Sequence, residues 1–202
     1  MSEKSETITI ADLMAESGVG FGTSGARGLA EAMSDRVCYL YTVGFLQYLE
    51  KAAAIHPGDQ VALAGDFRPS TPRIMTAAAA AVADLGYRPV NCGNIPTPAL
   101  AAYAIGNQAA SLMVTGSHIP DDRNGIKFNR PDGEVLKSDE AGIREQVVSV
   151  ARIRLRLVVA IEQQPGAPAI LEADVEHDHL RAPQQLVAVL VVAVALVGHV
   201  GP

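Results

Sequence analysis

The fold of this chain is decided by one stretch, Ser111-Leu112-Met113-Val114-Thr115-Gly116-Ser117-His118-Ile119-Pro120-Asp121-Asp122-Arg123-Asn124-Gly125-Ile126-Lys127-Phe128. It begins as an apolar run and then changes abruptly to Gly, Ser, His, Pro, Asp and Asn, which indicates a strand that ends in a loop. Open α/β sheets place functional side chains on loops at the carboxyl ends of their strands. The hydroxyl of Ser117, the imidazole of His118 and the ammonium of Lys127 are therefore candidates for a site.

The segments before this stretch alternate between strand and helix patterns. Short apolar runs at 61–65 and 111–114, and a strand-like piece at 88–93, are typical of buried parallel strands. Helical patterns lie between them at 71–85 and 98–106. This order with short connections predicts a parallel sheet with right-handed crossovers. We therefore expect an α/β fold, a mainly parallel sheet with helices on both faces.

Further elements are expected on either side of this core. Before it, the patterns favour a short helix at 10–16 and a longer one at 35–54, with Ser34 as its N-cap. After it, the turn residues at 130–134 predict a hairpin, and 138–148 begins another helix.

A glycine-rich segment, 19–29, carries Thr23, Ser24 and Arg27 among four glycines. Exposed backbone N–H groups beside such side chains suit phosphate oxygens. An ordinary glycine-rich hairpin is the competing interpretation.

The composition changes at Val150, so we divide the chain into 1–149 and an atypical Ala/Val/Leu-rich tail at 150–202. The tail has no Ser, Thr, Asn, Lys or aromatic residue, a strong departure from ordinary usage. It is either a genuine appendage or the product of a shifted reading frame, and the composition favours the second hypothesis. The pattern His177-Asp178-His179 looks like a metal cluster, but we assign it no function.

The overall charge of −6 and the pI near 5.3 argue against a general binder of nucleic acid or of membrane surfaces. The N-terminus lacks an apolar signal core, and the most apolar run, 186–197, is shorter than the roughly 20 residues that span a bilayer. Two cysteines, Cys38 and Cys92, form no disulfide framework. We expect a cytoplasmic protein, and the sequence does not indicate its oligomeric state.

The chemistry of the 115–127 loop suits phosphoryl transfer. We expect a turn at Asn124-Gly125 that folds Lys127 back toward Ser117. A phosphorylated Ser117 would carry about −1.5 to −2 charges and would need cations, for which Lys127, Arg27 and Arg123 are candidates. Lys127 or His118 could accept a proton. The alternatives are a turn residue at Ser117, a packing residue at His118 and a solvated strand residue at Lys127.

Four motifs, in the expected order, resemble the α-D-phosphohexomutase family, and most of all its phosphomannomutase branch. The active-serine loop of that family is similar to Thr115-Gly116-Ser117-His118-Ile119-Pro120 with Asn124-Gly125-Ile126-Lys127, and its N-terminal signature to 21–28. Two further elements are similar to Gly65-Asp66-Phe67-Arg68-Pro69-Ser70 and to Pro96-Thr97-Pro98. From this resemblance we expect residues 1–149 to form the first domain of such an enzyme.

The resemblance implies a mechanism. A phosphoserine at Ser117 would exchange its phosphoryl group with a hexose phosphate, through a bisphosphorylated sugar, and so interconvert mannose 6-phosphate and mannose 1-phosphate for nucleotide-sugar and polysaccharide synthesis. Arg27, Lys127 and His118 would assist, and Mg²⁺ would contact the phosphate on Ser117. Ile119 departs from the family pattern, because many members have Asn there.

The family's remaining domains, with the Asp-Gly-Asp-x-Asp-Arg metal loop, the sugar-specificity loop and the phosphate clamp, have no counterpart in this sequence. We therefore expect a truncated chain that does not turn over alone. The alternatives are a phosphoglucomutase of the same family and a non-catalytic module that binds sugar phosphates.

Overall fold

One mixed β-sheet forms the centre of the computed structural model, which describes residues 7–22, 24–149, 159–160 and 170–171. Its strands follow the order β2-β3-β7-β6-β4-β5, and β8 pairs with β7. Their bounds are Gly20–Phe21 (β2), Gly25–Leu29 (β3), Gln60–Gly65 (β4), Arg88–Asn91 (β5), Ala110–Val114 (β6), Arg123–Arg130 (β7) and Gly133–Glu134 (β8). The expected α/β class is confirmed.

The parallel half of the sheet matches the prediction for 61–115. Strand β4 pairs in parallel with both β5 and β6. The crossovers carry α3, Thr71–Asp84, and α4, Thr97–Gly106. Each helix has a proline in its first turn, where the missing N–H group removes no helical hydrogen bond. Ser70 stands at the N-cap of α3.

The antiparallel half of the sheet differs from the prediction in one place. Asn124 and Gly125 do not form the expected turn, because both lie inside β7 and pair with Gly28 and Arg27 of β3. The chain reverses earlier, between the end of β6 and the start of β7. The glycine-rich segment is the hairpin β2–β3, which was the competing interpretation. A Cβ at Gly25 would overlap the backbone of Ile126, so glycine allows β3 and β7 to approach closely.

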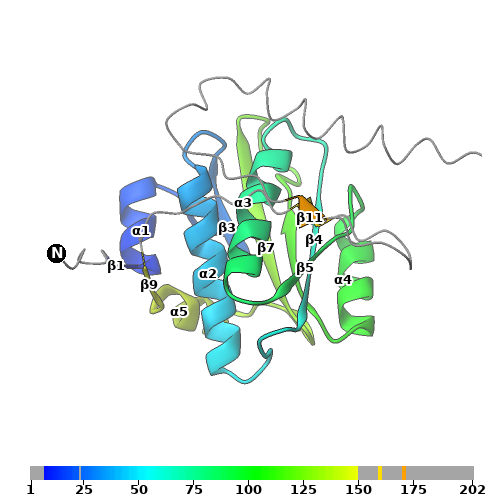
Figure 1. The fold of residues 1–202 in the computed structure, drawn as a ribbon. Coiled ribbons are helices and arrows are strands. Elements are labelled where there is room, and N and C mark those ends of the chain that lie inside the picture. The colour runs from blue at the N-terminus through cyan, green and yellow to red at the C-terminus, as the bar shows by residue number, and fades with distance from the viewer. Residues whose placement is uncertain (1–6, 23, 150–158, 161–169, 172–202) are drawn as a thin grey trace, which may run out of the picture.

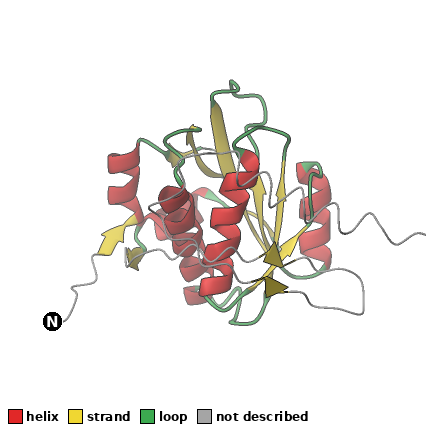
Figure 2. Ribbon diagram, turned by 45° about the horizontal axis from the view of Figure 1, so that its top comes forward, coloured by secondary structure: helices red, strands yellow, loops and turns green. Residues whose placement is uncertain are grey.

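Helices cover both faces of the sheet, as predicted (Figure 1). Helix α2, Asp35–Lys51, packs beside α3 on one face, where Leu63, Val114 and Phe128 are buried. The side chains of Ala62, Ala64 and Met113, which point the opposite way, contact Leu100 of α4. Figure 2 shows the sheet between these two layers. Ser34 caps α2 by accepting a hydrogen bond from Val37 N–H, as expected.

A smaller group of elements closes one side of the molecule. It consists of β1 (Thr7–Thr9), α1 (Ile10–Ser17), α5 (Lys137–Arg144) and β9 (Val147–Ser149). Strands β1 and β9 pair in antiparallel fashion, with Thr7 opposite Ser149. The predicted helix at 138–148 is therefore shorter than expected, since its last residues form β9.

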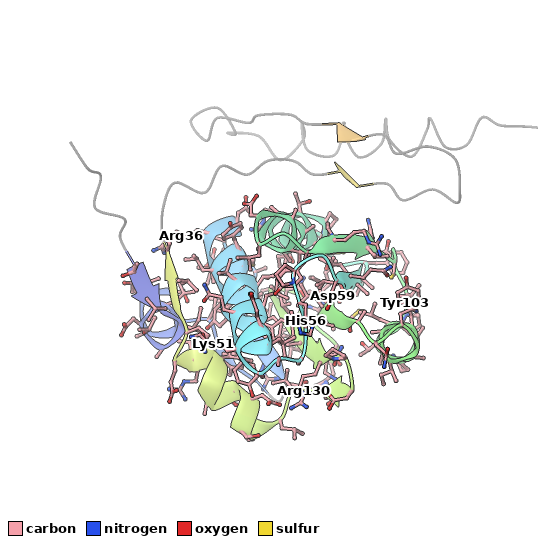
Figure 3. The ribbon with its side chains drawn as sticks, turned by 60° about the horizontal axis from the view of Figure 1, so that its bottom comes forward. Arg36, Lys51, His56, Asp59, Tyr103 and Arg130 are labelled. Atoms are coloured by element: carbon pink, nitrogen blue, oxygen red, sulfur yellow. The ribbon has the colours of Figure 1, made fainter. Side chains whose placement is uncertain are left out.

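Two side-chain contacts hold α5 in this position, and Figure 3 shows Lys51 and Arg130 beside that helix. Lys51 Nζ donates to Gln146 Oε1 at 2.6 Å, and an Arg130 guanidinium nitrogen donates to Asp139 Oδ1 at 3.0 Å. The first contact joins the connection between α5 and β9 to α2, and the second joins the helix to the β7–β8 hairpin.

The remaining expectations concern the cysteines and the tail. Cys38 is buried and Cys92 half-buried, and both are free. Burial raises the pKa of the Cys38 thiol to about 12, which fits a core residue. Two short strands, β10 (Val159–Ala160) and β11 (Ile170–Leu171), pair with each other. The patterns at 177–179 and 186–197 lie outside the described residues.

Among the helices in the described part of the chain, none has the length and apolar character needed to cross a bilayer.

Candidate functional site

Ser117 lies on the loop between β6 and β7 with an unusual backbone. Its φ angle is 52°, in the left-handed region that few residues other than glycine adopt. Its backbone N–H donates to Thr115 Oγ1 at 2.9 Å. The side chain is exposed. The local hydrogen bond and the left-handed backbone therefore present the hydroxyl to solvent at the carboxyl end of β6.

His118 is the predicted site residue that the structure places in contact with Ser117. Its Nδ1 lies 3.4 Å from Ser117 Oγ, and both side chains are exposed. A neutral imidazole nitrogen at this distance could accept the hydroxyl proton after a small approach.

Asp66, in the loop after β4, ties that loop to the start of the Ser117 loop. Its Oδ2 accepts the backbone N–H of Gly116 at 3.0 Å, and its Oδ1 accepts the hydroxyl of Thr71 at 2.6 Å and the backbone N–H of Arg68 at 3.0 Å. Burial by itself would raise the pKa of Asp66, but these hydrogen bonds, with one from the Thr115 hydroxyl, hold its pKa below the ordinary value. The carboxylate therefore stays ionised at neutral pH.

Arg68 binds the rest of the loop through backbone carbonyls. One terminal nitrogen of its guanidinium donates to Pro120 O at 2.7 Å and to Arg123 O at 2.9 Å, and the other donates to Ile119 O at 2.7 Å. Its Nε lies 3.4 Å from Asp66 Oδ2. A Cβ at Gly116 would overlap this guanidinium, so glycine is required where the loop passes over it.

Arg27 and Lys127 lie on one face of the sheet. In the β3–β7 register, Arg27 is opposite Gly125 and Lys127 is opposite Gly25, so the two cations are diagonal neighbours. Ile126 and Phe128 of β7 point to the face of the sheet that packs against α2 and α3. Arg27 and Lys127 therefore lie on the opposite face, where α4 packs on β4 and β6. The Arg27 side chain is exposed and lies against Gly22. The amide of Thr115 donates to Gly125 O. Because Gly125 is also the residue opposite Arg27, it lies between Arg27 and the base of the Ser117 loop.

The expected contact between Lys127 and Ser117 does not occur. Lys127 Nζ pairs with Glu134 Oε1 of β8 at 2.6 Å, because the β7–β8 hairpin places the carboxylate beside the ammonium. Within the described residues, no hydrogen bond or ion pair joins Ser117 to Arg27, Arg123 or Lys127. Their role at a phosphoserine therefore stays a prediction.

Asp66 and Arg68 were not predicted to be site residues. The signal that could have found them is the strand order: β4 and β6 are parallel neighbours, so the loops that follow them meet at one sheet edge. Both residues lie in the 65–70 motif, directly after β4.

The same residues bear on the expected magnesium ion. In the described part of the chain, no three His, Cys, Asp or Glu side chains gather to hold a metal ion. Asp66 uses both oxygens for hydrogen bonds, and Asp121 Oδ1 lies 3.6 Å from Arg68. These residues do not by themselves fit a resident divalent cation, which needs several oxygen ligands. We therefore derive no step through a metal.

Residues 18–152 match the model of the family described as phosphoglucomutase/phosphomannomutase, alpha/beta/alpha domain I. The match covers more than half of the chain, and the chain belongs to this family.

Similar proteins carry related names. A phosphomannomutase from Sinorhizobium fredii is 51% identical over 126 residues, which are 62% of this chain and 27% of that protein. A phosphoglucosamine mutase from Synechococcus sp. is 37% identical over 137 residues, 64% of this chain and 28% of that protein. The chain thus spans little more than a quarter of the length of these curated relatives.

A solved structure has the same fold. It is that of a protein from Thermus thermophilus, provisionally described as a phosphomannomutase. It superimposes with a TM-score of 0.56 at 25% sequence identity, over 62% of this chain and 29% of that one.

Proposed function

We propose that Ser117 carries a phosphoryl group and exchanges it with a hexose phosphate. The observation that supports this most directly is the exposed hydroxyl of a left-handed serine, beside an imidazole, on the β6 loop of a phosphoglucomutase/phosphomannomutase domain. A phosphohexomutase is an isomerase, so the reaction begins and ends with the same phosphorylated serine.

In the proposed transfer, the bond between phosphorus and Ser117 Oγ breaks, and a bond forms between phosphorus and a sugar hydroxyl oxygen. The proton of the sugar hydroxyl passes to a neutral acceptor, for which we propose His118, and from there to the departing Ser117 Oγ, so that serine leaves as a hydroxyl. In the return step, a bond forms between Ser117 Oγ and the other phosphorus of the bisphosphorylated sugar, the bond from that phosphorus to the sugar oxygen breaks, and the serine proton passes to that oxygen. The protein would contribute mainly by positioning the reacting groups and by balancing the charge of the phosphoryl group. These two effects account for most of the catalysis of phosphoryl transfer.

Arg27 and Lys127 are the cations that we propose for the charge balance. Both lie on one face of the sheet. Arg27 is opposite Gly125, whose carbonyl accepts the amide of Thr115 at the base of the loop, and Lys127 is two residues further along β7. A phosphate group that carries nearly two negative charges would compete with Glu134 for the ammonium of Lys127.

For the substrate we propose mannose 6-phosphate and mannose 1-phosphate, on the strength of the phosphomannomutase at 51% identity. Phosphoglucomutase activity is the alternative within the family. We expect the 202-residue chain to accept a phosphoryl group without completing the conversion, because it spans so small a part of its relatives. Mg²⁺ as a cofactor stays a prediction.

Mass spectrometry of the intact 202-residue chain tests the proposal. After incubation with a hexose 1,6-bisphosphate, we expect the mass of one phosphoryl group to be added, and peptide fragmentation to place it on Ser117. Ser117→Ala should abolish the addition, whereas Ser138→Ala, which removes another hydroxyl on an exposed turn of α5, should leave it unchanged. A phosphoryl group that still appears on the Ser117→Ala protein would refute the proposal.

The competing function is binding of a sugar phosphate without transfer, which the engagement of Lys127 by Glu134 favours. Calorimetric binding of mannose 6-phosphate, together with no phosphoryl gain from the bisphosphate, would select it.

A further inference from the structure

The hydrogen bonds of Arg68 go to the loop that carries Ser117. Its three carbonyl partners, Ile119, Pro120 and Arg123, lie beyond Ser117 on the way to β7. On the near side of Ser117, the same guanidinium lies against Gly116. One side chain therefore contacts both limbs of the loop, and Ser117 is at the turn between them.

These contacts leave Arg68 little capacity for a phosphate. A guanidinium has five N–H donors, of which three go to carbonyl oxygens, and the Nε lies 3.4 Å from a carboxylate oxygen of Asp66. The side chain is only 12% exposed. Its positive charge is balanced by Asp66, whose oxygens also hold the amide of Gly116.

We propose that Arg68, oriented by Asp66, is a positioning residue that holds residues 115–123 in the conformation that presents Ser117 Oγ for phosphoryl transfer. The inference rests on the proposed role of Ser117 as the phosphoryl carrier. Arg68 acts through the loop backbone and contacts neither sugar nor phosphate.

The arrangement needs a guanidinium and not merely a positive charge. The planar fork of Arg68 reaches three carbonyl oxygens and a carboxylate at once, which a lysine ammonium on a flexible stem cannot do. The left-handed backbone of Ser117 is unfavourable for a residue with a side chain, so the surrounding bonds must maintain it. Arg68→Lys therefore keeps the charge and removes the geometry.

Two measurements on the 202-residue chain test this inference, with Arg68→Lys as the variant and Arg88→Lys as the matched control. Arg88 is exposed at the start of the edge strand β5, which β4 separates from β6 and its loop. The first measurement is amide hydrogen exchange of residues 115–123. We expect it to become roughly tenfold faster in Arg68→Lys and to stay unchanged in the control.

The second measurement is the rate at which Ser117 gains a phosphoryl group at increasing concentrations of a hexose 1,6-bisphosphate. Misplacing a reacting group by about 1 Å costs roughly 10²-fold in rate, so we expect the maximal rate to fall by about that factor. The half-saturating concentration should stay the same, because Arg68 does not touch the ligand. In Arg27→Lys, by contrast, the half-saturating concentration should rise.

Unchanged exchange at 115–123 would overturn the inference, and so would a raised half-saturating concentration with an unchanged maximal rate. If the wild-type chain gains no phosphoryl group, the proposed function fails, while the exchange data still decide whether Arg68 orders the loop. If Arg68→Lys does not fold, Asp66→Asn replaces it, because it removes the charge partner of Arg68 with little change in shape.

Discussion

At the scale of single residues, the backbone of Ser117 is the most unusual feature of the candidate site. A left-handed residue other than glycine is typical of positions that the surrounding structure maintains for a purpose. Thr115 and the contacts of Asp66 and Arg68 supply that support. The hydroxyl is thus held away from the loop, where a ligand can reach it.

The left-handed backbone predicts a stability difference between two variants that both lack the hydroxyl. Ser117→Gly should be more stable than Ser117→Ala by about 1 kcal/mol, because glycine adopts a positive φ without steric penalty. Urea denaturation measures this difference. At Ser138, in the first turn of α5, the order should be reversed, since alanine favours a helix. Equal stabilities of the two Ser117 variants would contradict the strained backbone.

Gly116 gives a second prediction. In Gly116→Ala, the new methyl group must displace the guanidinium of Arg68, so we expect a loss of about 1–3 kcal/mol in the free energy of unfolding. The control is Gly106→Ala at the end of α4, where a Cβ would meet no atom. That variant should be as stable as the wild-type protein or slightly more so. Denaturant midpoints for both variants decide the matter.

The lowered pKa of Asp66 sets a pH dependence. A carboxyl group whose pKa is lower in the folded than in the unfolded protein adds stability above the ordinary value of 3.8, and this is lost as the pH falls through the folded value. Acid should therefore weaken the 115–123 loop. Asp66→Asn should remove this part of the acid sensitivity and leave the part that arises from Asp132 and Asp139, whose pKa values are also lowered. Urea midpoints from about pH 6 to about pH 2 would measure both.

At the scale of secondary-structure elements, the β7–β8 hairpin controls Lys127. The short strand β8 brings Glu134 to within 2.6 Å of the ammonium, so the lysine is engaged before any ligand arrives. The site residue that the sequence placed beside Ser117 is instead held by its own hairpin.

Removing that carboxylate should strengthen anion binding. Partly exposed ion pairs contribute up to about 1 kcal/mol, so Glu134→Gln should bind inorganic phosphate about two- to fivefold more tightly in an NMR titration. The control is Asp132→Asn, which removes a carboxylate from the same hairpin but one that pairs with Arg130. An equal gain in both variants would mean that overall charge, and not the release of Lys127, is responsible.

Helices and strands from 60 to 114 could be predicted, because β4 and β6 are continuous apolar runs that are buried along their length, and α3 and α4 each have a proline in the first turn. The turn predicted at Asn124-Gly125 is a strand in the structure. This pair favours hairpin turns when exposed, but here Asn124 is buried and its amide donates to Ser70 and Thr71, so tertiary contacts outweigh local preference.

The contacts of Arg68 could not be predicted from the sequence for a related reason. Its partners are backbone carbonyls, which every residue has, so no side-chain pattern at 119–123 marks them. Ser117 and His118, by contrast, are neighbours in sequence, and their proximity needed no tertiary information.

At the scale of the whole molecule, the pairing of β1 with β9 joins the two ends of the α/β unit. Val148 of β9 is fully buried in the core, and Gln146 accepts a hydrogen bond from Lys51 of α2. Strand β9 is therefore a part of the core and not an appendage to it.

This arrangement predicts where the chain can be shortened. A chain that ends at Ser149 should keep the free energy of unfolding within about 0.5 kcal/mol, whereas one that ends at Gln146 should lose about 2 kcal/mol or more with β9 and Val148. Thermal and urea unfolding of the two proteins would show it. A marked loss in the chain that ends at Ser149 would mean that residues beyond 149 contribute to stability, against the boundary expected from composition, and equal losses would mean that β9 contributes nothing.

Because Thr7 lies opposite Ser149, the polypeptide enters and leaves the α/β unit at one place. A unit with adjoining ends can be inserted into a host loop as a cassette, or closed into a ring by a short linker. The ring can then be reopened at the exposed turn 56–59, between α2 and β4, with every strand pairing kept. The same fold would therefore accept more than one order of its helices and strands along the polypeptide.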